Sequence, residues 1–264
     1  MSSPLLAIDE AGAGPPLVLL HGLATSSVIW AAVVGELSRT RRVVTVDLPG
    51  FGRSAPVDDD FELERVASRI AHGLAARGVT GPYDIVGHSL GGVVAAALAA
   101  NRPRSAARLV LVAPAGLAPL PPIAVRMLAA AADPLLAARR RLAPLAELPL
   151  GRRALLTFAA ADGARIPPSQ ARMMMQASAQ ARRTSAALAT VAATDLRALL
   201  ERVRAPIGVI WGDADRTISS VYARMLMQAR PDARIEIIHG AGHVVMAERP
   251  TEFTAALLRL LERL

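Results

Sequence analysis

Short apolar runs alternate along the chain with longer stretches in which apolar residues recur every three or four positions. The short runs are bounded by turn-forming residues and predict buried strands at 17–20, 43–46, 85–86, 109–112, 207–211 and 235–238. The longer stretches predict helices at 28–37, 61–76, 90–100, 219–229 and 250–261. Alternating strands and helices are typical of parallel strands joined by crossover helices. We therefore predict an α/β fold with a mostly parallel central sheet and helices on both faces.

The alternation stops between residues 115 and 205, where patterns rich in Ala, Leu, Arg and Met predict helices and no strand. A compact domain rarely leaves so long a stretch as loop. We therefore expect residues 115–205 to form an inserted helical lid. The core is expected to comprise residues 1–114 and 206–264.

Composition narrows the class of protein. Hydrophobic residues make up 53% of the chain and aromatic residues 3%, so Ala, Leu and Val must build the core. There is no cysteine, which excludes disulfides, thiolate metal sites and a cysteine nucleophile. The first residues lack the basic and apolar regions of a secretory signal, and prolines interrupt the longest uncharged runs. We expect a cytoplasmic protein without a transmembrane segment.

Charge is distributed unevenly. The net charge is +8, and residues 115–205 alone hold 13 Arg against 5 acidic residues. Neither interleaved aromatic residues nor a nucleic-acid-binding motif accompanies these arginines, so we expect a solvated basic face and no nucleic-acid partner. As an alternative, the arginines at 139–141 and 152–153 would meet the phosphates of coenzyme A or of an acidic carrier protein.

The strongest candidate for chemistry is Ser89. The segment Gly87-His88-Ser89-Leu90-Gly91 fits the pattern G-x-S-x-G, follows an apolar strand-like run and opens a predicted helix. This is the setting in which a sharp turn presents a nucleophilic serine, and small neighbours let the strand and the helix approach each other. We therefore predict that Ser89 is a nucleophile.

A serine nucleophile needs a histidine base. His243 lies on a glycine-rich loop before the last helix, where we expect the mobility that a general base needs, and His239 is the weaker alternative. The two histidines are four residues apart, but Gly240 and Gly242 argue against the helix that would bring them together on zinc. No metal site is predicted.

An orienting carboxylate is expected past the strand at 207–211. Asp213 and Asp215 both follow it, at the sheet edge where open parallel sheets carry their sites. Turn formation is the simpler explanation for an aspartate here, and we allow that role for Asp213. A serine, an aspartate and a histidine in this chain order match the α/β-hydrolase motif.

Main-chain amides complete the expected site. The N–H groups of Leu90, directly after the serine, and of Leu23, after the strand at 17–20, are the candidate oxyanion donors. His21, Met127 and Met174 are candidate pocket residues. The thioether side chains of the two methionines adapt to irregular acyl groups.

At these positions the chain resembles the α/β-hydrolase superfamily, in its lid-bearing esterase, lactonase and haloperoxidase-like branch. The resemblance rests on motifs outside the lid: His21-Gly22 with Trp30, DLPGFGRS at 47–54, GHSLGG at 87–92, WGDAD at 211–215, and Gly242-His243 with Glu248 and Pro250. It implies that Asp215 is the acid and that the turn at 47–54 is structural. Ser219 departs from the proline that many relatives carry there. Relatives with dehalogenase or epoxide hydrolase activity carry aspartate where this chain has Ser89, which argues against both activities.

These observations predict a hydrolase that cleaves a small-molecule carboxylic ester through Ser89, His243 and Asp215, by way of an acyl-enzyme and without a cofactor. Three alternatives remain open: a thioesterase or acyltransferase acting on acyl-CoA or an acyl-carrier protein, a carbon–carbon bond hydrolase or perhydrolase, and a non-catalytic ligand-binding homologue.

Overall fold

The computed structural model describes residues 6–56, 61–118 and 121–264. Its strands are β1 (Ile8–Ala11), β2 (Pro16–Leu20), β3 (Arg42–Val46), β4 (Tyr83–His88), β5 (Ala106–Val112), β6 (Ile207–Gly212) and β7 (Arg234–Ile238). Its α-helices are α1 (Ala31–Leu37), α2 (Leu63–Ala76), α3 (Leu90–Asn101), α4 (Pro122–Leu142), α5 (Pro149–Leu155), α6 (Pro168–Gln180), α7 (Thr184–Ala193), α8 (Leu196–Glu201), α9 (Ala223–Ala229), α10 (Val245–Glu248) and α11 (Pro250–Arg263). Short 3-10 helices are η1 (Ser27–Trp30), η2 (Ala143–Glu147), η3 (Gly163–Arg165) and η4 (Ser220–Tyr222).

The strands form one sheet in the order β1-β3-β2-β4-β5-β6-β7, in which only β1 is antiparallel to its neighbour. The predicted α/β class and the six predicted strands are confirmed. β1 is the strand that the pattern did not predict. Of its four residues, only Ile8 is buried, and Asp9 and Glu10 are exposed. Because acidic residues are depleted in strands, this segment becomes one through backbone pairing with β3 at the sheet edge.

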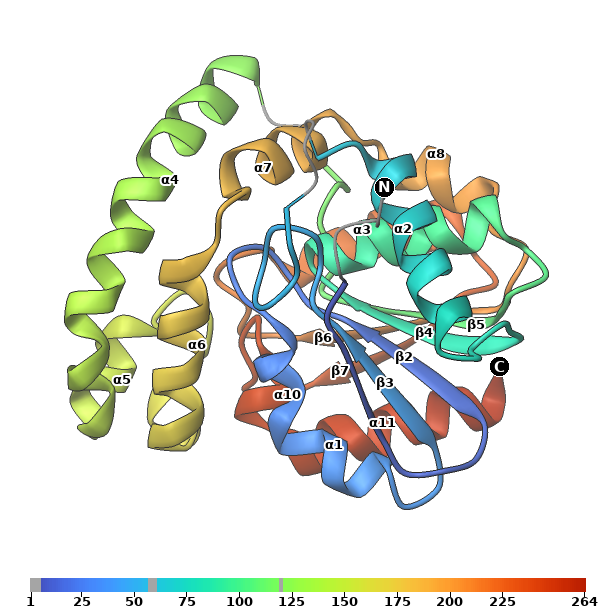
Figure 1. Ribbon diagram of the computed structural model, residues 1–264, viewed down its shortest axis with the longest axis horizontal. Helices are drawn as coiled ribbons and strands as arrows, with labels where there is room; N and C mark the ends of the chain where they lie inside the picture. Colours follow the sequence, from blue (N-terminus) through green and yellow to red (C-terminus); the bar gives the residue numbers. More distant parts are fainter. Residues whose placement is uncertain (1–5, 57–60, 119–120) are drawn as a thin grey trace.

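Helices cover both faces of the sheet (Figure 1). Val18 and Leu20 of β2 point to the face covered by α2 and α3, whereas Leu17 and Leu19 point to the face covered by α1 and α11. Successive side chains of a strand alternate between its two faces. Because both faces are covered, β2 is an uninterrupted apolar run, as expected for a buried parallel strand.

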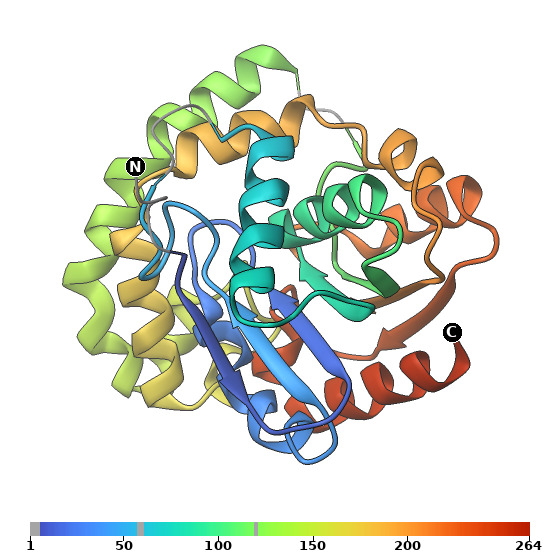
Figure 2. The ribbon, with the colours of Figure 1, turned by 45° about the vertical axis from the view of Figure 1, so that its right-hand side comes forward.

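The chain between β5 and β6 contains α4 to α8, and we call it the helical insertion. Figures 1 and 2 show α4, α5 and α6 standing beside the sheet rather than over one of its faces. In contrast, α8 packs against α3, and its Leu196, Leu199 and Leu200 lie in the core. None of the helices in the described ranges is long and apolar enough to cross a membrane.

The register of the sheet gathers the loops that carry the predicted site. Leu20 pairs with Gly87, His88 with Val112, Val112 with Ile210, and Gly212 with Ile238. Because these strands run parallel, the segments that follow them all emerge at one edge.

Candidate active site

Ser89 lies on the sharp turn between β4 and α3. Its backbone has φ 53° and ψ −116°, a conformation that costs a non-glycine residue about 1–3 kcal/mol. The turn is tight because α3 crosses close to the sheet. A Cβ at Gly87 would lie 2.3 Å from the carbonyl oxygen of Gly91, and a Cβ at Gly91 would lie 2.4 Å from that of Leu20. The two glycines therefore permit the close approach that lifts Ser89 to the sheet edge.

The Ser89 side chain is largely buried. The residue retains 8% of its surface, and its hydroxyl makes no hydrogen bond within the described part of the chain. Its main chain is fixed, because the Ser89 N–H donates to the carbonyl of Val112 at 3.0 Å.

His243 and Asp215 form a buried pair. Nδ1 of His243 lies 2.8 Å from Oδ2 of Asp215, and the two side chains are 9% and 0% exposed. The other carboxylate oxygen of Asp215 accepts the N–H groups of Thr217 at 2.8 Å and Ile218 at 2.9 Å. With Nδ1–H donated to Asp215, Nε2 of His243 carries the lone pair that can accept a proton.

Asp213 and His239 form a second pair of the same composition. His239 Nδ1 lies 2.8 Å from Oδ2 of Asp213, but the side chains are 86% and 39% exposed. Asp213 also accepts the N–H of Gly240 at 2.7 Å, so it closes the turn that precedes His243. The hydrogen bond with His239 holds the pKa of Asp213 below its ordinary value.

Residues 242–244, which we call the base loop, are held at three consecutive positions. The N–H of Gly242 donates to Glu248 at 2.7 Å, and the N–H of Val244 donates to the carbonyl of Ala159 at 2.8 Å. Nε2–H of His88 donates to the carbonyl of His243 at 3.1 Å. These hydrogen bonds tie the backbone of the base loop to its surroundings.

His88 connects the turn of Ser89 to the base loop. Its ring lies 4.6 Å from the ring of His243, centre to centre. Burial lowers the pKa of His88 well below its ordinary value, and His243 beside it acts in the same direction. A neutral His88 adds no positive charge beside His243.

The two candidate oxyanion donors lie on different elements next to Ser89: Leu23 in the loop after β2 and Leu90 at the start of α3. Leu90 is the first residue of α3, where a backbone N–H has no partner within the helix. A Cβ at Gly22, next to Leu23, would lie 3.2 Å from Cβ of Ser89, so this loop runs close to the serine.

The predicted pocket residues occupy three different environments. His21 is fully buried, donates Nδ1–H to the carbonyl of Gly22 at 2.8 Å and accepts the N–H of Leu48 at 2.8 Å, so its contacts favour a structural role. Burial lowers the pKa of His21. Met174, on the buried side of α6, packs in the core with 7% of its surface exposed, whereas Met127 on α4 is 68% exposed.

Two of the arginines named in the phosphate-binding alternative point inward. Arg152 is 6% exposed and donates to the carbonyls of Ala146 and Glu147 at 2.9 and 3.0 Å. Arg139 donates to the Ser178 hydroxyl and the Leu155 carbonyl. The structure therefore contradicts a phosphate-binding role for these two side chains, which hold the helical insertion together.

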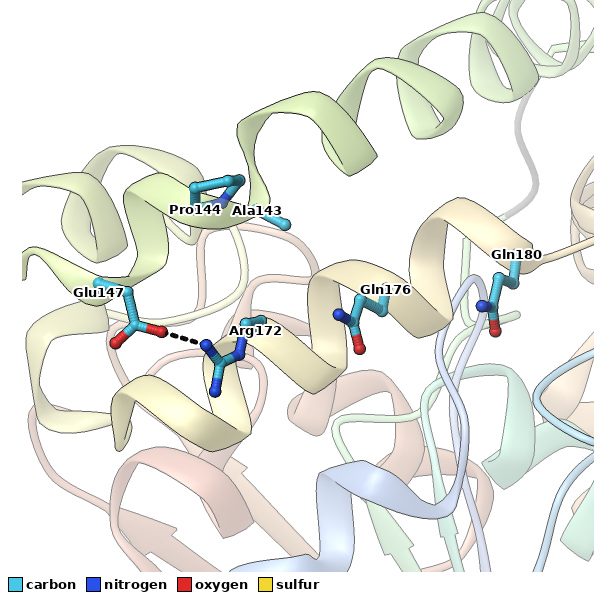
Figure 3. Close-up of a pocket in the computed structure, with 6 residues that line it drawn as sticks. All are labelled: Ala143, Pro144, Glu147, Arg172, Gln176 and Gln180. Carbon is cyan, nitrogen blue, oxygen red and sulfur yellow. Dashed lines mark hydrogen bonds and ion pairs between the residues drawn. The ribbon is translucent and has the colours of Figure 1, made fainter.

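A separate hollow of about 550 Å³ lies in the helical insertion between η2 and α6 (Figure 3). It is lined by Ala143, Pro144, Glu147, Arg172, Gln176 and Gln180. An ion pair of 2.6 Å joins Glu147 to Arg172 at one end. Its lining includes none of the predicted site residues.

Sequence reasoning missed the contribution of residues 157–162, which precede η3. We call these residues the clamp segment. Its Ala161 and Asp162 donate their N–H groups to Glu248 at 3.0 and 2.7 Å, and Glu248 is 2% exposed. The clamp segment carries no recognisable motif, so the burial of Glu248 with these partners became visible only in the structure.

The described residues contain no group of three His, Cys, Asp or Glu side chains that could hold a metal ion. The ionisable side chains of the site pair with one another and with backbone groups instead.

A family model described as "Alpha/beta hydrolase family" matches residues 17–257. The chain is 32% identical over 258 residues to a pimeloyl-[acyl-carrier protein] methyl ester esterase of Nitrosomonas europaea, which covers 94% of this chain and 96% of that protein. It is 31% identical over 268 residues to polyketide synthase ThaQ of Burkholderia thailandensis; the match covers 97% of this chain but only 12% of that protein. Among solved structures, a thermophilic esterase from Thermogutta terrifontis superposes with a TM-score of 0.76 at 27% identity, covering 98% of this chain and 93% of that chain.

Proposed function

We propose that this chain, which belongs to the alpha/beta hydrolase family and is an enzyme, hydrolyses a carboxylic ester through Ser89, His243 and Asp215. The observation that carries the proposal is the buried hydrogen bond between His243 and Asp215. His88, the residue before Ser89, donates to the carbonyl of His243 and so connects the base loop to the turn of the serine. An imidazole held in this tautomer presents Nε2 as a base.

In the proposed reaction, Nε2 of His243 takes the proton of the Ser89 hydroxyl while Oγ attacks the ester carbonyl carbon. The amides of Leu23 and Leu90 donate to the oxygen that becomes negative. His243 then gives its proton to the departing alcohol, which leaves an acyl group on Ser89. A water molecule, deprotonated by His243, attacks this acyl group, releases the acid and regenerates the serine.

Asp215 orients the base throughout this cycle. Its two oxygens are engaged by His243 and by the amides of Thr217 and Ile218, so the carboxylate is fixed before substrate arrives. Preorganised dipoles of this kind need no rearrangement during the reaction.

The test is the Ser89→Ala variant with p-nitrophenyl esters. We expect turnover to fall by on the order of 10⁴ to 10⁶, and labelling by a fluorophosphonate probe to disappear, while the circular dichroism spectrum stays unchanged. Residues 213–219, which follow β6, are called the acid loop. A matched Ser219→Ala variant should keep full activity, because Ser219 ends this loop and, within the described residues, its hydroxyl only accepts the N–H of Val221. Undiminished turnover by Ser89→Ala would refute the assignment.

A second candidate is the ester of an acyl group carried on an acyl-carrier protein. The observation that favours it is the similarity to the pimeloyl-[acyl-carrier protein] methyl ester esterase. A second supporting observation is the basic helical insertion, in which four arginines are exposed: Arg126, Arg141, Arg165 and Arg182. The discriminating measurement compares a free methyl ester with the same ester on the carrier protein across a salt series. Preference for the carrier-bound ester that weakens with salt supports this candidate, and equal rates at all salt concentrations contradict it.

We further propose that α4 to α7 act as the lid that selects the acyl group. Their position beside the carboxyl ends of the strands supports this role (Figure 2).

A further inference from the structure

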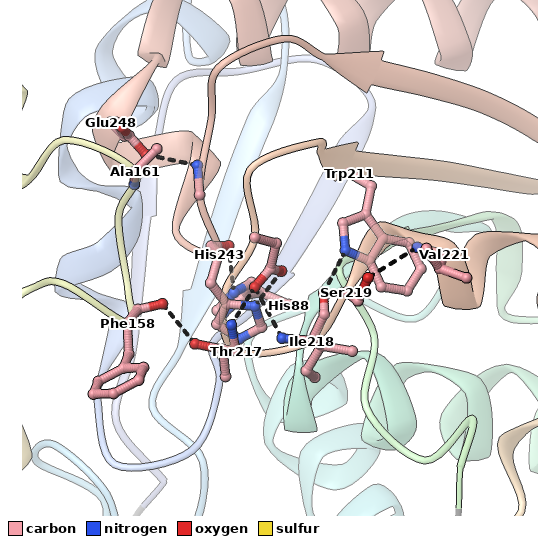
Figure 4. A network of polar contacts seen from close by, with 12 residues as sticks. His88, Phe158, Ala161, Trp211, Thr217, Ile218, Ser219, Val221, His243 and Glu248 are labelled. Carbon is pink, nitrogen blue, oxygen red and sulfur yellow. Dashed lines mark hydrogen bonds and ion pairs between the residues drawn. The ribbon is translucent and has the colours of Figure 1, made fainter.

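The clamp segment, residues 157–162, lies across both loops that supply the proposed acid and base. It belongs to the helical insertion, yet its main chain contacts the acid loop at one end and the base loop at the other. Figure 4 shows Phe158 and Ala161 of this segment beside Thr217, His243 and Glu248.

On the acid side, two side chains donate to carbonyls of the clamp segment. The Thr217 hydroxyl donates to the carbonyl of Phe158 at 2.6 Å, and the guanidinium of Arg216 donates to that of Thr157 at 3.4 Å. Thr217 also donates its own N–H to Asp215. Thr217 therefore connects the clamp segment directly to Asp215, the proposed acid.

On the base side, Glu248 joins two parts of the chain that are distant in sequence. One carboxylate oxygen accepts both Gly242 N–H at 2.7 Å and Ala161 N–H at 3.0 Å, and the other accepts Asp162 N–H at 2.7 Å. Gly242 directly precedes His243. A Cβ at Gly242 would lie 2.5 Å from the nitrogen of Ala161, so the two main chains are already in contact.

The carboxylate of Glu248 is well suited to hold the clamp segment and the base loop together. A carboxylate that accepts three N–H groups forms charge-assisted hydrogen bonds, which are stronger than neutral ones. Glu248 is 2% exposed, so water cannot replace these partners at low cost. Exposed Glu252, four residues further on, pairs only with Arg249 at 3.5 Å. Of these two acidic residues, Glu248 alone hydrogen-bonds to the base loop and to the clamp segment, whereas Glu252 reaches the carbonyl of Gly240, outside the base loop, only through Arg249 at 3.3 Å.

We propose that the clamp segment positions His243 against Asp215, and that Glu248 is the positioning residue that fastens it to the base loop. This inference rests on the proposed function, because it concerns the alignment of the proposed base. It makes correct seating of the helical insertion a condition for catalysis. The insertion then shapes the catalytic centre as well as any acyl pocket.

The experiment compares the full-length E248Q and E252Q variants with the unmodified protein. Glutamine keeps one acceptor oxygen but turns an NH₂ group toward backbone donors, so at least one of the three hydrogen bonds is lost. We expect kcat for a p-nitrophenyl ester to fall about tenfold in E248Q with KM almost unchanged, since small misplacements of a catalytic group are costly. Fluorophosphonate labelling should slow by the same factor. E252Q, which removes the same charge at the surface, should retain wild-type values.

Three further readouts make the outcomes decisive. A lower melting temperature for E248Q with wild-type kcat, measured where the variant is folded, would mean a purely structural role and would overturn the inference. If E248Q does not fold, the T217V variant decides. It loses the hydrogen bond to Phe158 and keeps the N–H donated to Asp215, so the inference expects kcat to fall about threefold, and wild-type kcat would overturn it.

If the unmodified protein is neither active nor labelled, the proposed function has failed. The downfield proton resonance of His243 Nδ1–H then still reports on positioning: its loss in E248Q supports the inference, and its persistence contradicts it.

Discussion

Two aspartate–histidine pairs lie on the same two loops and differ in their surroundings. Asp215–His243 and Asp213–His239 both have 2.8 Å between Nδ1 and the carboxylate oxygen. His243 is 9% exposed at its side chain and His239 is 86% exposed. The distance alone does not distinguish the proposed catalytic pair from the surface pair. Burial and the neighbouring contacts do.

The difference matters because solvent controls the strength of the interaction. An exposed ion pair is screened by water and salt and contributes little to stability. A buried pair interacts in a medium of lower dielectric constant, and its geometry is fixed by the groups around it. In this protein His88 and the clamp segment supply that fixation to the base loop, and His239 has no comparable set of contacts within the described residues.

The strongest test of the comparison replaces each histidine by alanine. We expect His243→Ala to reduce kcat by on the order of 10⁴ to 10⁶, because the serine loses its base, and His239→Ala to stay within about twofold of wild type. Steady-state turnover of a p-nitrophenyl ester measures both. A greater loss in His239→Ala than in His243→Ala would reverse the assignment.

The aspartates provide the next test. Asp215→Asn should lower kcat by roughly 10³ to 10⁴, because an amide NH₂ facing Nδ1 favours the wrong tautomer of His243. Asp213→Asn should leave kcat almost unchanged. Equal losses in the two variants would show that the surface pair also takes part in the reaction.

The smallest expected effect is on the pH dependence of the melting temperature. The folded protein holds the pKa of Asp213 below its ordinary value, so its contribution to stability is present above that ordinary value and is lost as the pH falls through the lowered one. We expect the melting temperature of Asp213→Asn to lie about 2 °C or less below wild type at pH 6, and the difference to shrink as the pH falls through the lowered pKa of Asp213. Scanning calorimetry across this range, repeated in 1 M salt, measures it. A difference that grows on acidification would contradict the assigned sign.

The fold followed closely from local patterns. The six strands predicted from apolar runs are present, because a strand buried on both faces is marked by its own composition. β1 was not predictable in this way, since Asp9 and Glu10 disfavour a strand and pairing with β3 overrides that preference. The short helix α10 was also missed, because four residues carry too little periodicity.

The site was predictable in its residue types and less so in its connections. Ser89 and the histidine–aspartate candidates could be named from motifs, since turns and loops of this kind have recognisable local sequences. Glu248 stood only at the end of a motif, and the clamp segment had no motif. Its contacts with the site are made by main-chain atoms, which carry no information about sequence. The inward orientation of Arg139 and Arg152 was hidden for the same reason, because their partners are mainly backbone carbonyls.

The sequence by itself determined which segments become strands and helices and which side chains are available for chemistry, because periodicity and turn-forming residues act over a few neighbouring positions. Only the tertiary structure decided that Asp215 is buried with His243 and Asp213 is exposed with His239. The partners are separated by 28 and 26 residues, and both pairs have the same local chemistry. What separates them is the packing of the helical insertion and of the turn at Ser89 against the parts of these loops that carry Asp215 and His243, and not against the parts that carry Asp213 and His239. Packing depends on parts of the chain that meet only when it folds.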